Sequence, residues 1–396
     1  MRAQDFFCKS VSIVAAALAI LVPLDGANAA TFKVLYSFNA YSGDASDPWA
    51  GLIIDSAGNL YGTTYSGGSS NQGTVFKIAP DGTETLLHSF TGGSDGGNPF
   101  GGLQLDSKGN LWGTTQYGGA MDCGQYVSGC GVVFKLAPNG AEKVLHTFTG
   151  GSDGSDPFAG LNKKHIGTTA SGGANDFGSI FKIASNGTKT ILYSFGNSPD
   201  GYNPEADVIT DSAGNIYGTT ANGGNTYGTV FKLDSSGTET LLYRFAGGND
   251  GAYPHNSSLV IDKAGNLYGT TVEGGTHNYC GVVFKVAPNG SEAVLYSFDA
   301  YAGDGCNPWG GLVGNSKGTT FYGTTGYGGT SPNCSGGCGT VFELKNGTES
   351  VLYSFTAGND GCYPIDRLVK DAAGNLYGTA QNCGMYYGGT VFEISP

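Results

Sequence analysis

The chain has 396 residues with a formal net charge of −13, and 13% of its residues are charged. A net negative surface repels phosphate backbones, so the composition excludes nucleic acid as a partner. Glycine and proline together make up about a fifth of the chain, which is below the level typical of disordered low-complexity sequence. Aromatic residues at 12%, together with many Val, Ile and Thr, favour β-strands.

The first 29 residues predict a secretory signal peptide. Arg2 and Lys9 supply a positive start, an apolar run follows from Val11 to Leu24, and Ala27-Asn28-Ala29 is a small-residue cleavage pattern. A retained membrane anchor is the alternative, but the apolar run is short for a span of about 20 residues. The mature protein is therefore expected to comprise residues 30–396, to have no membrane span, and to be secreted, periplasmic or extracellular.

The mature sequence opens with an apolar segment, Phe32–Phe38, and the unit after it reads as four short strands. We name these strands a, b, c and d, and they are expected at residues 51–54, 60–64, 73–78 and 83–90. Turn residues join strand a to strand b and strand c to strand d. The four strands should therefore form an antiparallel meander.

Three short sequences recur seven times each along the chain, in constant order. Gly-Thr-Thr, with Gly-Thr-Ala as its last copy, begins at Gly62, Gly113, Gly167, Gly218, Gly269, Gly323 and Gly378. Gly-(Thr/Val/Ser)-(Val/Ile)-Phe begins at Gly73, Gly131, Gly178, Gly228, Gly281, Gly339 and Gly389. Val-Leu-Tyr-Ser-Phe or a near copy begins at Val34, Leu86, Val144, Ile191, Leu241, Val294 and Val351. Four strands in a repeat of about fifty residues are typical of a propeller blade.

The two ends of the mature chain complement each other. Phe32–Phe38 corresponds to a strand d without strands a to c, and Gly389–Ile394 corresponds to a strand c without strand d. We therefore predict an all-β fold, a seven-bladed β-propeller with four antiparallel strands per blade, in which the N-terminal strand closes the last blade. An open solenoid is the alternative, and it would leave both edges unpaired. In the third unit, Leu161–Ile166 is too short for the usual a–b hairpin, so a shortened hairpin is expected there.

These repeats resemble the GloVer tandem repeat family of exported bacterial proteins. The resemblance covers nearly the whole mature chain and rests on segments such as Asp106–Thr115 (DSKGNLWGTT) and Phe148–Gly154 (FTGGSDG). It implies export and a β-propeller-like repeat, and it implies no particular reaction or ligand. Many members carry C-terminal surface-sorting anchors, whereas this sequence ends at Pro396 without one.

Eight cysteines follow the signal peptide, and an even count in an exported chain predicts disulfide bonds. They fall in the b–c loops and in the d–a connections between blades, which emerge on one face of a propeller. The expected pairs are Cys123–Cys130, Cys280–Cys306, Cys334–Cys338 and Cys362–Cys383. The alternative pairing joins Cys338 to Cys362 and Cys334 to Cys383. Zinc at Cys334 and Cys338 is less favoured, because no His is close in sequence and the compartment is oxidising, so no metal ligand is assigned.

The d–a connections carry a recurring aspartate and a recurring proline. The aspartates, which include Asp95 and Asp304, could form a ring of carboxylates for Ca²⁺ or polar sugars, since hard cations take oxygen ligands. The favoured alternative is that each aspartate ties its own turn through bonds to the backbone. No cofactor is expected, and Ca²⁺ is the one ion that these carboxylates suit.

The residues after the prolines differ between units and are expected to surround the channel mouth: Trp49, Phe100, Phe158, Glu205, His255, Trp309 and Ile365. Aromatic faces near carboxylates suit a carbohydrate, whereas inter-blade packing is the alternative reading. The candidate binding residues are Trp49, Phe100, Phe158, Glu205, His255, Trp309, Asp95 and Asp304. Glu205 and His255 interrupt an apolar position in adjacent units, so they are also the candidate catalytic pair, as acid and base.

Three functions remain open at this point. A binding or interaction module for extracellular carbohydrate, another surface polymer or a protein partner is favoured. A lyase or hydrolase acting on a polysaccharide or a small molecule at the channel mouth is the first alternative. A structural envelope protein without a small-ligand site is the second. The fold alone does not choose among them, and a monomer is expected.

Overall fold

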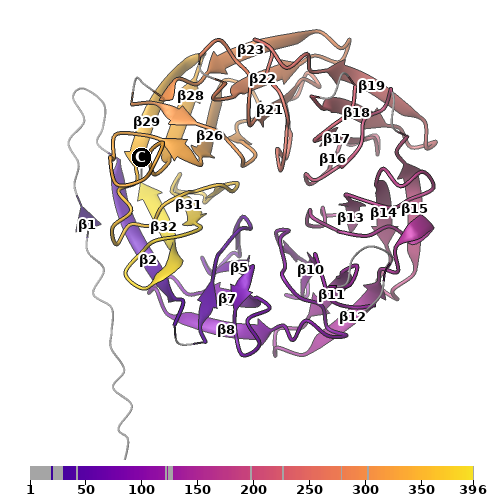
Figure 1. Ribbon diagram of the computed structural model, residues 1–396, viewed down its shortest axis with the longest axis horizontal. Helices are drawn as coiled ribbons and strands as arrows, with labels where there is room; N and C mark the ends of the chain where they lie inside the picture. Colours follow the sequence, from indigo (N-terminus) through magenta and orange to yellow (C-terminus); the bar gives the residue numbers. More distant parts are fainter. Residues whose placement is uncertain are drawn as a thin grey trace, which may run out of the picture.

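The computed structural model describes residues 19–20, 30–41, 43–120, 123, 128–196, 199–224, 227–277, 279–300 and 303–395. These residues form a ring of seven blades around a central channel (Figure 1), as the sequence predicts. Strands dominate these residues, η1 (Gly151–Asp153) is a short 3₁₀ turn, and no helix among the described residues has the length and apolarity needed to cross a bilayer. The predicted signal peptide lies outside the described residues, apart from β1 (Ala19–Ile20).

Each blade is an antiparallel sheet. The blades are numbered 1 to 7 in the order in which their innermost strands occur along the chain. Blade 1 contains β4 (Ile53–Ile54), β5 (Leu60–Thr64), β7 (Thr74–Ile78) and β8 (Glu84–Ser89). Blade 2 contains β9 (Gln104–Leu105), β10 (Leu111–Thr115), β11 (Val132–Leu136) and β12 (Glu142–Thr147). Blade 3 contains β13 (Ile166–Thr169), β14 (Ser179–Ile183) and β15 (Lys189–Ser194). Blades 4 and 5 contain β16 (Ile209–Thr210), β17 (Ile216–Thr220), β18 (Thr229–Leu233) and β19 (Glu239–Arg244); and β20 (Val260–Ile261), β21 (Leu267–Thr271), β22 (Val282–Val286) and β23 (Glu292–Ser297). Blades 6 and 7 contain β25 (Val313–Gly314), β26 (Thr320–Thr325), β28 (Thr340–Lys345) and β29 (Thr348–Ser354); and β30 (Val369–Lys370), β31 (Leu376–Ala380), β32 (Tyr387–Ser395) and β2 (Thr31–Asn39).

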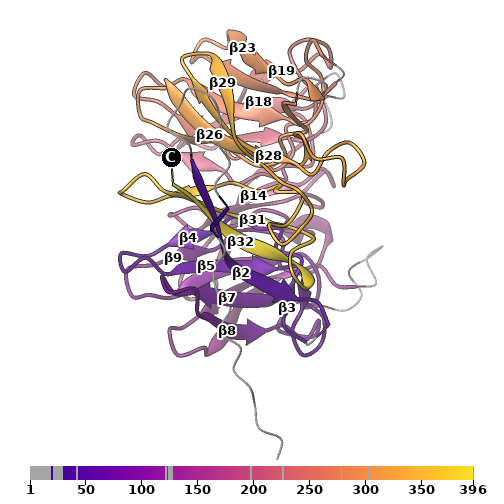
Figure 2. The same cartoon turned by 90° about the vertical axis from the view of Figure 1, so that its left-hand side faces the viewer.

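The N-terminal strand β2 closes the ring by pairing with β32, the last strand of the chain, as Figure 2 shows. The pairing is antiparallel and sets Val34 opposite Phe392. The predicted closure is confirmed. An unpaired strand edge is a site for aggregation. The pairing of β2 with β32 leaves neither of these two edges unpaired.

The three recurring sequences meet in one contact at every junction between blades. A Cβ added to Gly62 would lie 2.5 Å from Cζ of Phe76, the residue directly opposite it on β7. The ring of Phe76 also packs edge-on against Phe38 of the preceding blade, with centroids 4.9 Å apart. Glycine is therefore required so that the phenylalanine of strand c can lie across strand b. The same arrangement recurs in the other six blades, from Gly113 with Phe134 to Gly378 with Phe392.

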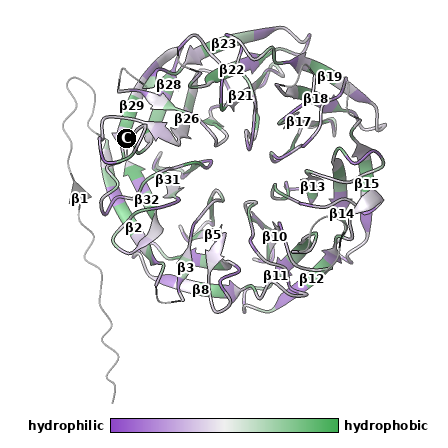
Figure 3. Cartoon of the chain, viewed as in Figure 1, coloured by the Kyte–Doolittle hydropathy of each residue, from purple (hydrophilic) through white to green (hydrophobic). Residues whose placement is uncertain are grey.

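The hydrophobic core consists of seven clusters, and each lies between two adjacent blades. The cluster that joins blade 7 to blade 1 contains Phe38 and Val391 from blade 7 and Leu52, Phe76 and Ile78 from blade 1. Figure 3 shows hydrophobic residues on the strands around the whole ring. Apolar burial therefore holds the blades to each other as well as stabilising each sheet.

Strand a is shorter than expected, because β4 comprises Ile53–Ile54 rather than residues 51–54. Gly51 lies instead against the neighbouring blade, where an added Cβ would come within 2.9 Å of the Arg367 carbonyl oxygen. The inner strands converge at the channel, so their first residues pack against the next blade and leave the ladder of their own sheet.

The shortened hairpin of the third unit is confirmed, and blade 3 has three assigned strands. Asn162 accepts hydrogen bonds on its side-chain oxygen from the backbone N–H groups of Lys164 and Ile166. In the other blades an aspartate or asparagine in a longer turn accepts the corresponding backbone hydrogen bond. In blade 1, for example, Asp55 accepts from the backbone N–H of Asn59. An asparagine that bonds its own turn allows the hairpin to close in fewer residues.

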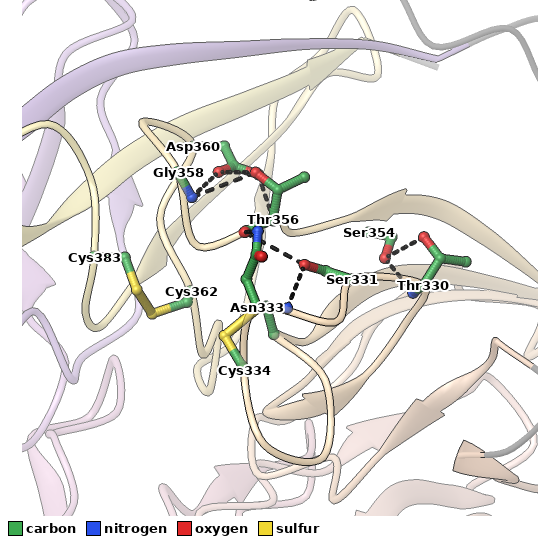
Figure 4. Close-up of a disulfide and its surroundings, with 11 residues drawn as sticks. Thr330, Ser331, Asn333, Cys334, Ser354, Thr356, Gly358, Asp360, Cys362 and Cys383 are labelled. Atoms are coloured by element: carbon green, nitrogen blue, oxygen red, sulfur yellow. Dashed lines mark hydrogen bonds between the residues drawn. A yellow bond between two sulfur atoms is a disulfide. The ribbon is translucent and has the colours of Figure 1, made fainter.

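The four disulfide bonds follow the expected pairing: Cys123–Cys130, Cys280–Cys306, Cys334–Cys338 and Cys362–Cys383. The alternative pairing and a zinc site at Cys334 and Cys338 are both wrong, because each of these sulfurs is bonded to another sulfur. Figure 4 shows Cys362–Cys383 beside the turn that Asp360 and Thr356 hold together. The bonds lie in the b–c loops and d–a connections, as the sequence predicts.

Candidate functional site

A cavity of about 540 Å³ occupies the centre of the ring, and all seven blades contribute to its lining. Trp49, Phe100 and Phe158 lie at one end, where the d–a connections enter strand a, and Lys163 and Lys370 lie near the a–b turns at the other. The cavity is within the size range of sites that hold a small organic ligand.

The d–a connections and b–c loops lie on the same face, as predicted. Two short ladders join them: β3 (Ala45–Ser46) with β6 (Ser66–Gly67), and β24 (Gly305–Cys306) with β27 (Tyr327–Gly328). Isolated bridges between Gly97 and Tyr117 and at the corresponding places in the remaining blades have the same effect. This face therefore carries the segments in which the blades differ most from each other.

The recurring aspartates hold their own turns. Asp304 accepts hydrogen bonds from the Tyr296 hydroxyl at 2.7 Å and from the backbone N–H of Asp299 at 3.0 Å. Asp95 accepts from the backbone N–H of Thr91 at 2.9 Å and lies 3.5 Å from the ring of His88. Neither Asp95 nor Asp304 lines the cavity. In the part of the chain that the structure describes, no three His, Cys, Asp or Glu side chains gather as a metal site.

Three of the predicted residues, Trp49, Phe100 and Phe158, form an aromatic wall on one side of the mouth. The ring centroids of Trp49 and Phe100 are 4.8 Å apart, and those of Phe100 and Phe158 are 3.7 Å apart. All three line the cavity. The three rings pack on one another across blades 1 to 3, and their exposed parts give this side of the cavity an aromatic, apolar surface.

Glu205 and His255 come together across the junction of blades 4 and 5. His255 Nδ1 lies 2.6 Å from Glu205 Oε2, and both side chains are partly exposed. Trp309 lies beyond His255, with ring centroids 5.5 Å apart. Glu205 lines the cavity, whereas His255 and Trp309 are not among its lining residues. Ile365 packs beside Trp309, because an added Cβ at Gly326 would contact both side chains.

Sequence analysis missed a second group of side chains, deeper in the channel. We call Asp207, Ser258, Asp366 and Arg367 the throat cluster, and all four line the same cavity as the aromatic wall. A signal was present: the third residue after the recurring proline is glycine in blades 1, 2, 3 and 6, but it is Asp207 in blade 4 and Arg367 in blade 7.

Burial shifts the protonation equilibria of the throat cluster. The pKa of Asp207 is raised by burial, against the lowering effects of Arg367, the Gly160 N–H at 2.8 Å and the Ser258 hydroxyl. Burial raises the pKa of Asp366 to about 8, with a further contribution from Asp207. Burial also lowers the pKa of Arg367, while both aspartates favour its charged form. The cluster is thus polar and carries little net charge at neutral pH.

The Arg367 guanidinium has no carboxylate within ion-pair distance among the described residues, although Asp207 and Asp366 act on it electrostatically. Arginine presents several N–H donors in a fixed plane. Arg367 lines the cavity together with Asp207 and Asp366, whose carboxyl oxygens can accept hydrogen bonds.

Two solved structures share the fold. The GH74 enzyme of Niastella koreensis has a TM-score of 0.54 and 16% identity, over 87% of this chain and 52% of that one. An extracellular domain described as part of a one-component system of B. thetaiotaomicron has a TM-score of 0.52 and 13% identity, over 89% of this chain and 41% of that one. This chain spans about half the length of these structures, and at such identities the likeness concerns the fold alone. No curated protein matches the sequence.

Comparison with protein families matches the Gloeobacter/Verrucomicrobia repeat at residues 20–166 and 124–336. Together the two overlapping matches cover most of the chain, as tandem copies of one unit should. They extend over the same recurring sequences that build the junctions between blades. The chain therefore belongs to the Gloeobacter/Verrucomicrobia repeat family.

Proposed function

We propose that this protein binds carbohydrate at the mouth of its central channel. The observation that carries the proposal is the aromatic wall of Trp49, Phe100 and Phe158 in a cavity that also exposes Glu205. Sugar rings have apolar faces that pack on aromatic side chains and hydroxyls that bond to carboxylates. A mouth that joins these two surfaces suits a polyhydroxylated ligand better than a purely apolar one.

The proposal extends to where the protein acts. Four disulfide bonds fit an oxidising compartment, and the first 29 residues have the pattern of an export signal. We therefore propose that the ligand is an extracellular glycan or another surface polymer.

Trp49→Ala is expected to weaken binding of a responsive glycan at least about tenfold, because a buried aromatic contact is worth more than about 1 kcal/mol at a binding site. The measurement is a glycan array with the wild-type protein, followed by calorimetry on the glycans that bind. Tyr279→Ala is the matched control, since Tyr279 is an aromatic residue of a b–c loop on the same face, is 69% exposed and does not line the cavity. Equal effects of the two substitutions, or an array without any bound glycan, would refute the proposal.

A second candidate function is cleavage of the bound carbohydrate, and the contact of 2.6 Å between Glu205 and His255 favours it. A histidine and a carboxylate at hydrogen-bond distance can hold and move a proton, as general acid–base catalysis requires. If the protein is an enzyme, Glu205→Gln and His255→Asn should each reduce product release by about a hundredfold or more while glycan binding persists. Chromatography of the glycans from the array, after incubation with wild-type protein, checks this. Intact glycans after prolonged incubation would leave binding as the function.

A further inference from the structure

We propose that the throat cluster is a subsite for the end of a neutral glycan chain, so that the ligand enters the channel end-on. This inference rests on the proposed carbohydrate binding at the mouth. It adds the direction in which the ligand lies and the chemical class of its terminal unit.

The first support is continuity. The aromatic wall and the throat cluster line one cavity, and no side chain separates Trp49 and Glu205 at the mouth from Asp207 and Arg367 below them as two distinct cavities. A ligand held at the wall therefore has space beneath it. A chain that crossed the mouth without entering would leave this space and its polar groups without a role in binding.

The second support is the asymmetry of the throat. The residue three positions after the proline is glycine in four blades, and at Gly51, Gly160 and Gly311 an added Cβ would clash with backbone of a neighbouring blade. An added Cβ at Gly102 would have one neighbour within 4 Å, the Gly51 carbonyl oxygen at 3.6 Å. By contrast, blades 4 and 7 place Asp207 and Arg367 at this position. The throat therefore offers room beside Gly102, and donors and acceptors at blades 4 and 7.

The third support is the chemistry of the polar side. Arg367 supplies N–H donors without an ion-pair partner in the described part of the chain, and Asp207 and Asp366 supply carboxyl acceptors nearby. A sugar hydroxyl both accepts and donates, so it can lie between a guanidinium and a carboxyl and bond to both. Ser258, which bonds to Asp207, extends the same surface.

The charges favour a neutral terminal sugar. Because the throat cluster carries little net charge, a terminal carboxylate, sulfate or amine would lose hydration there without an opposite net charge to replace it. A neutral ring with adjacent hydroxyls avoids this cost and can bond to both the guanidinium and a carboxyl group. The opening between the inner strands admits a chain end, whereas an internal segment of a polymer would have to thread through the ring.

The test compares variants of the full-length protein on neutral linear oligosaccharides prepared from a glycan that binds in the array. Each oligosaccharide is used in three forms: with both ends free, with its terminal unit oxidised to a uronate, and joined into a ring. End-on binding predicts that the free form binds at least about tenfold more tightly than the cyclic form, and more tightly than the oxidised form.

Gly102→Leu is designed to fill the throat without changing its charges, because the space beside Gly102 is open. It should reduce the affinity for the free form at least tenfold and leave the unfolding temperature near that of the wild type. Arg367→Gln should have the same effect on affinity by removing the guanidinium. Ser258→Ala provides a milder change for use if Arg367→Gln does not fold.

The outcomes separate this inference from the proposed function. If Trp49→Ala weakens binding while Gly102→Leu and Arg367→Gln do not, the glycan lies across the mouth and the end-on inference is wrong. Tighter binding of the oxidised form than of the neutral form would likewise overturn it, in favour of an anion subsite at Arg367. If none of the three substitutions alters binding, carbohydrate recognition in this channel fails as a whole.

Discussion

Raising the pH from about 5 to about 8 is expected to lower the unfolding temperature of this protein by roughly 5–10 °C. Five glutamates at the start of strand d cause the effect: Glu84, Glu142, Glu239, Glu292 and Glu349. Each has a buried side-chain oxygen without a hydrogen-bond partner among the described residues. An ionised carboxylate in such a place loses hydration that nothing in the protein replaces.

Burial, and then a neighbouring turn aspartate, raise the pKa of these glutamates. The pKa of Glu84 is raised to about 7, with Asp44 as the neighbour, and that of Glu349 to about 8, with Asp304 as the neighbour. Glu142, Glu239 and Glu292 also have pKa values raised to about 7. In blade 3 the corresponding residue is Lys189, which forms an ion pair of 2.9 Å with Asp153. In blade 3 a lysine next to the turn aspartate forms an ion pair with it. In the five blades with a glutamate at this position, protonation of the glutamate removes its repulsion from the aspartate.

The direction of the pH effect follows from these shifts. An unfolded glutamate has a pKa of about 4.3, so between that pH and about 8 the folded chain binds more protons than the unfolded chain, and stability falls as the pH rises. Aspartates in the a–b turns act oppositely, since hydrogen bonds from Asn110 and Trp112 outweigh burial and lower the pKa of Asp106 to about 2. Their contribution is lost on acidification. Stability should therefore be greatest near pH 5, as a rough value.

Thermal unfolding between about pH 4 and pH 9 measures the effect. Glu239→Gln should raise the unfolding temperature at pH 8 by about 1–2 °C and change it little at pH 5, because the amide stays neutral. Partial exposure of the glutamates limits each contribution to about 1 kcal/mol. Glu273→Gln, at an exposed carboxylate, is the control. An unfolding temperature that rises steadily from pH 5 to pH 8 would contradict the assignment.

Phe38→Ala is expected to lower the free energy of unfolding by about 3–5 kcal/mol, the usual cost of removing a buried aromatic ring. Phe38 is fully buried, and it belongs to β2, the strand that closes the ring. Its ring packs edge-on against Phe76 of blade 1, so the substitution opens a cavity at the junction between the first and last blades. Urea-induced unfolding followed by circular dichroism measures the change.

Leu86→Ala is the matched control, since Leu86 lies on β8, the corresponding strand of blade 1, but is 43% exposed. Its cost should stay below about 1 kcal/mol. Equal costs for the two substitutions would mean that the closing strand contributes no more than a surface strand does.

The repeating parts of this protein can be predicted from its amino-acid sequence. Gly62, Phe76 and Phe38 belong to three separate recurring sequences. The equivalent residues recur in every repeat because they pack together at each junction between blades, and a contact that occurs seven times is visible as a sequence pattern. The closing strand and the disulfide pairs could be predicted for a similar reason. Strand order within a blade is fixed by short turns, and the partner within reach of each cysteine lies in the same loop or in a neighbouring loop on the same face.

The tertiary structure alone decided which unrepeated side chains meet. Asp207 and Arg367 are 160 positions apart in the sequence and belong to blades 4 and 7, and they act on each other only because the ring brings both inner strands to one axis. The contact of Glu205 with His255 likewise depends on side-chain direction at the junction of two blades. A repeated sequence reveals the contacts that all blades share. A binding site, in contrast, is formed by residues that differ from the repeat in single blades.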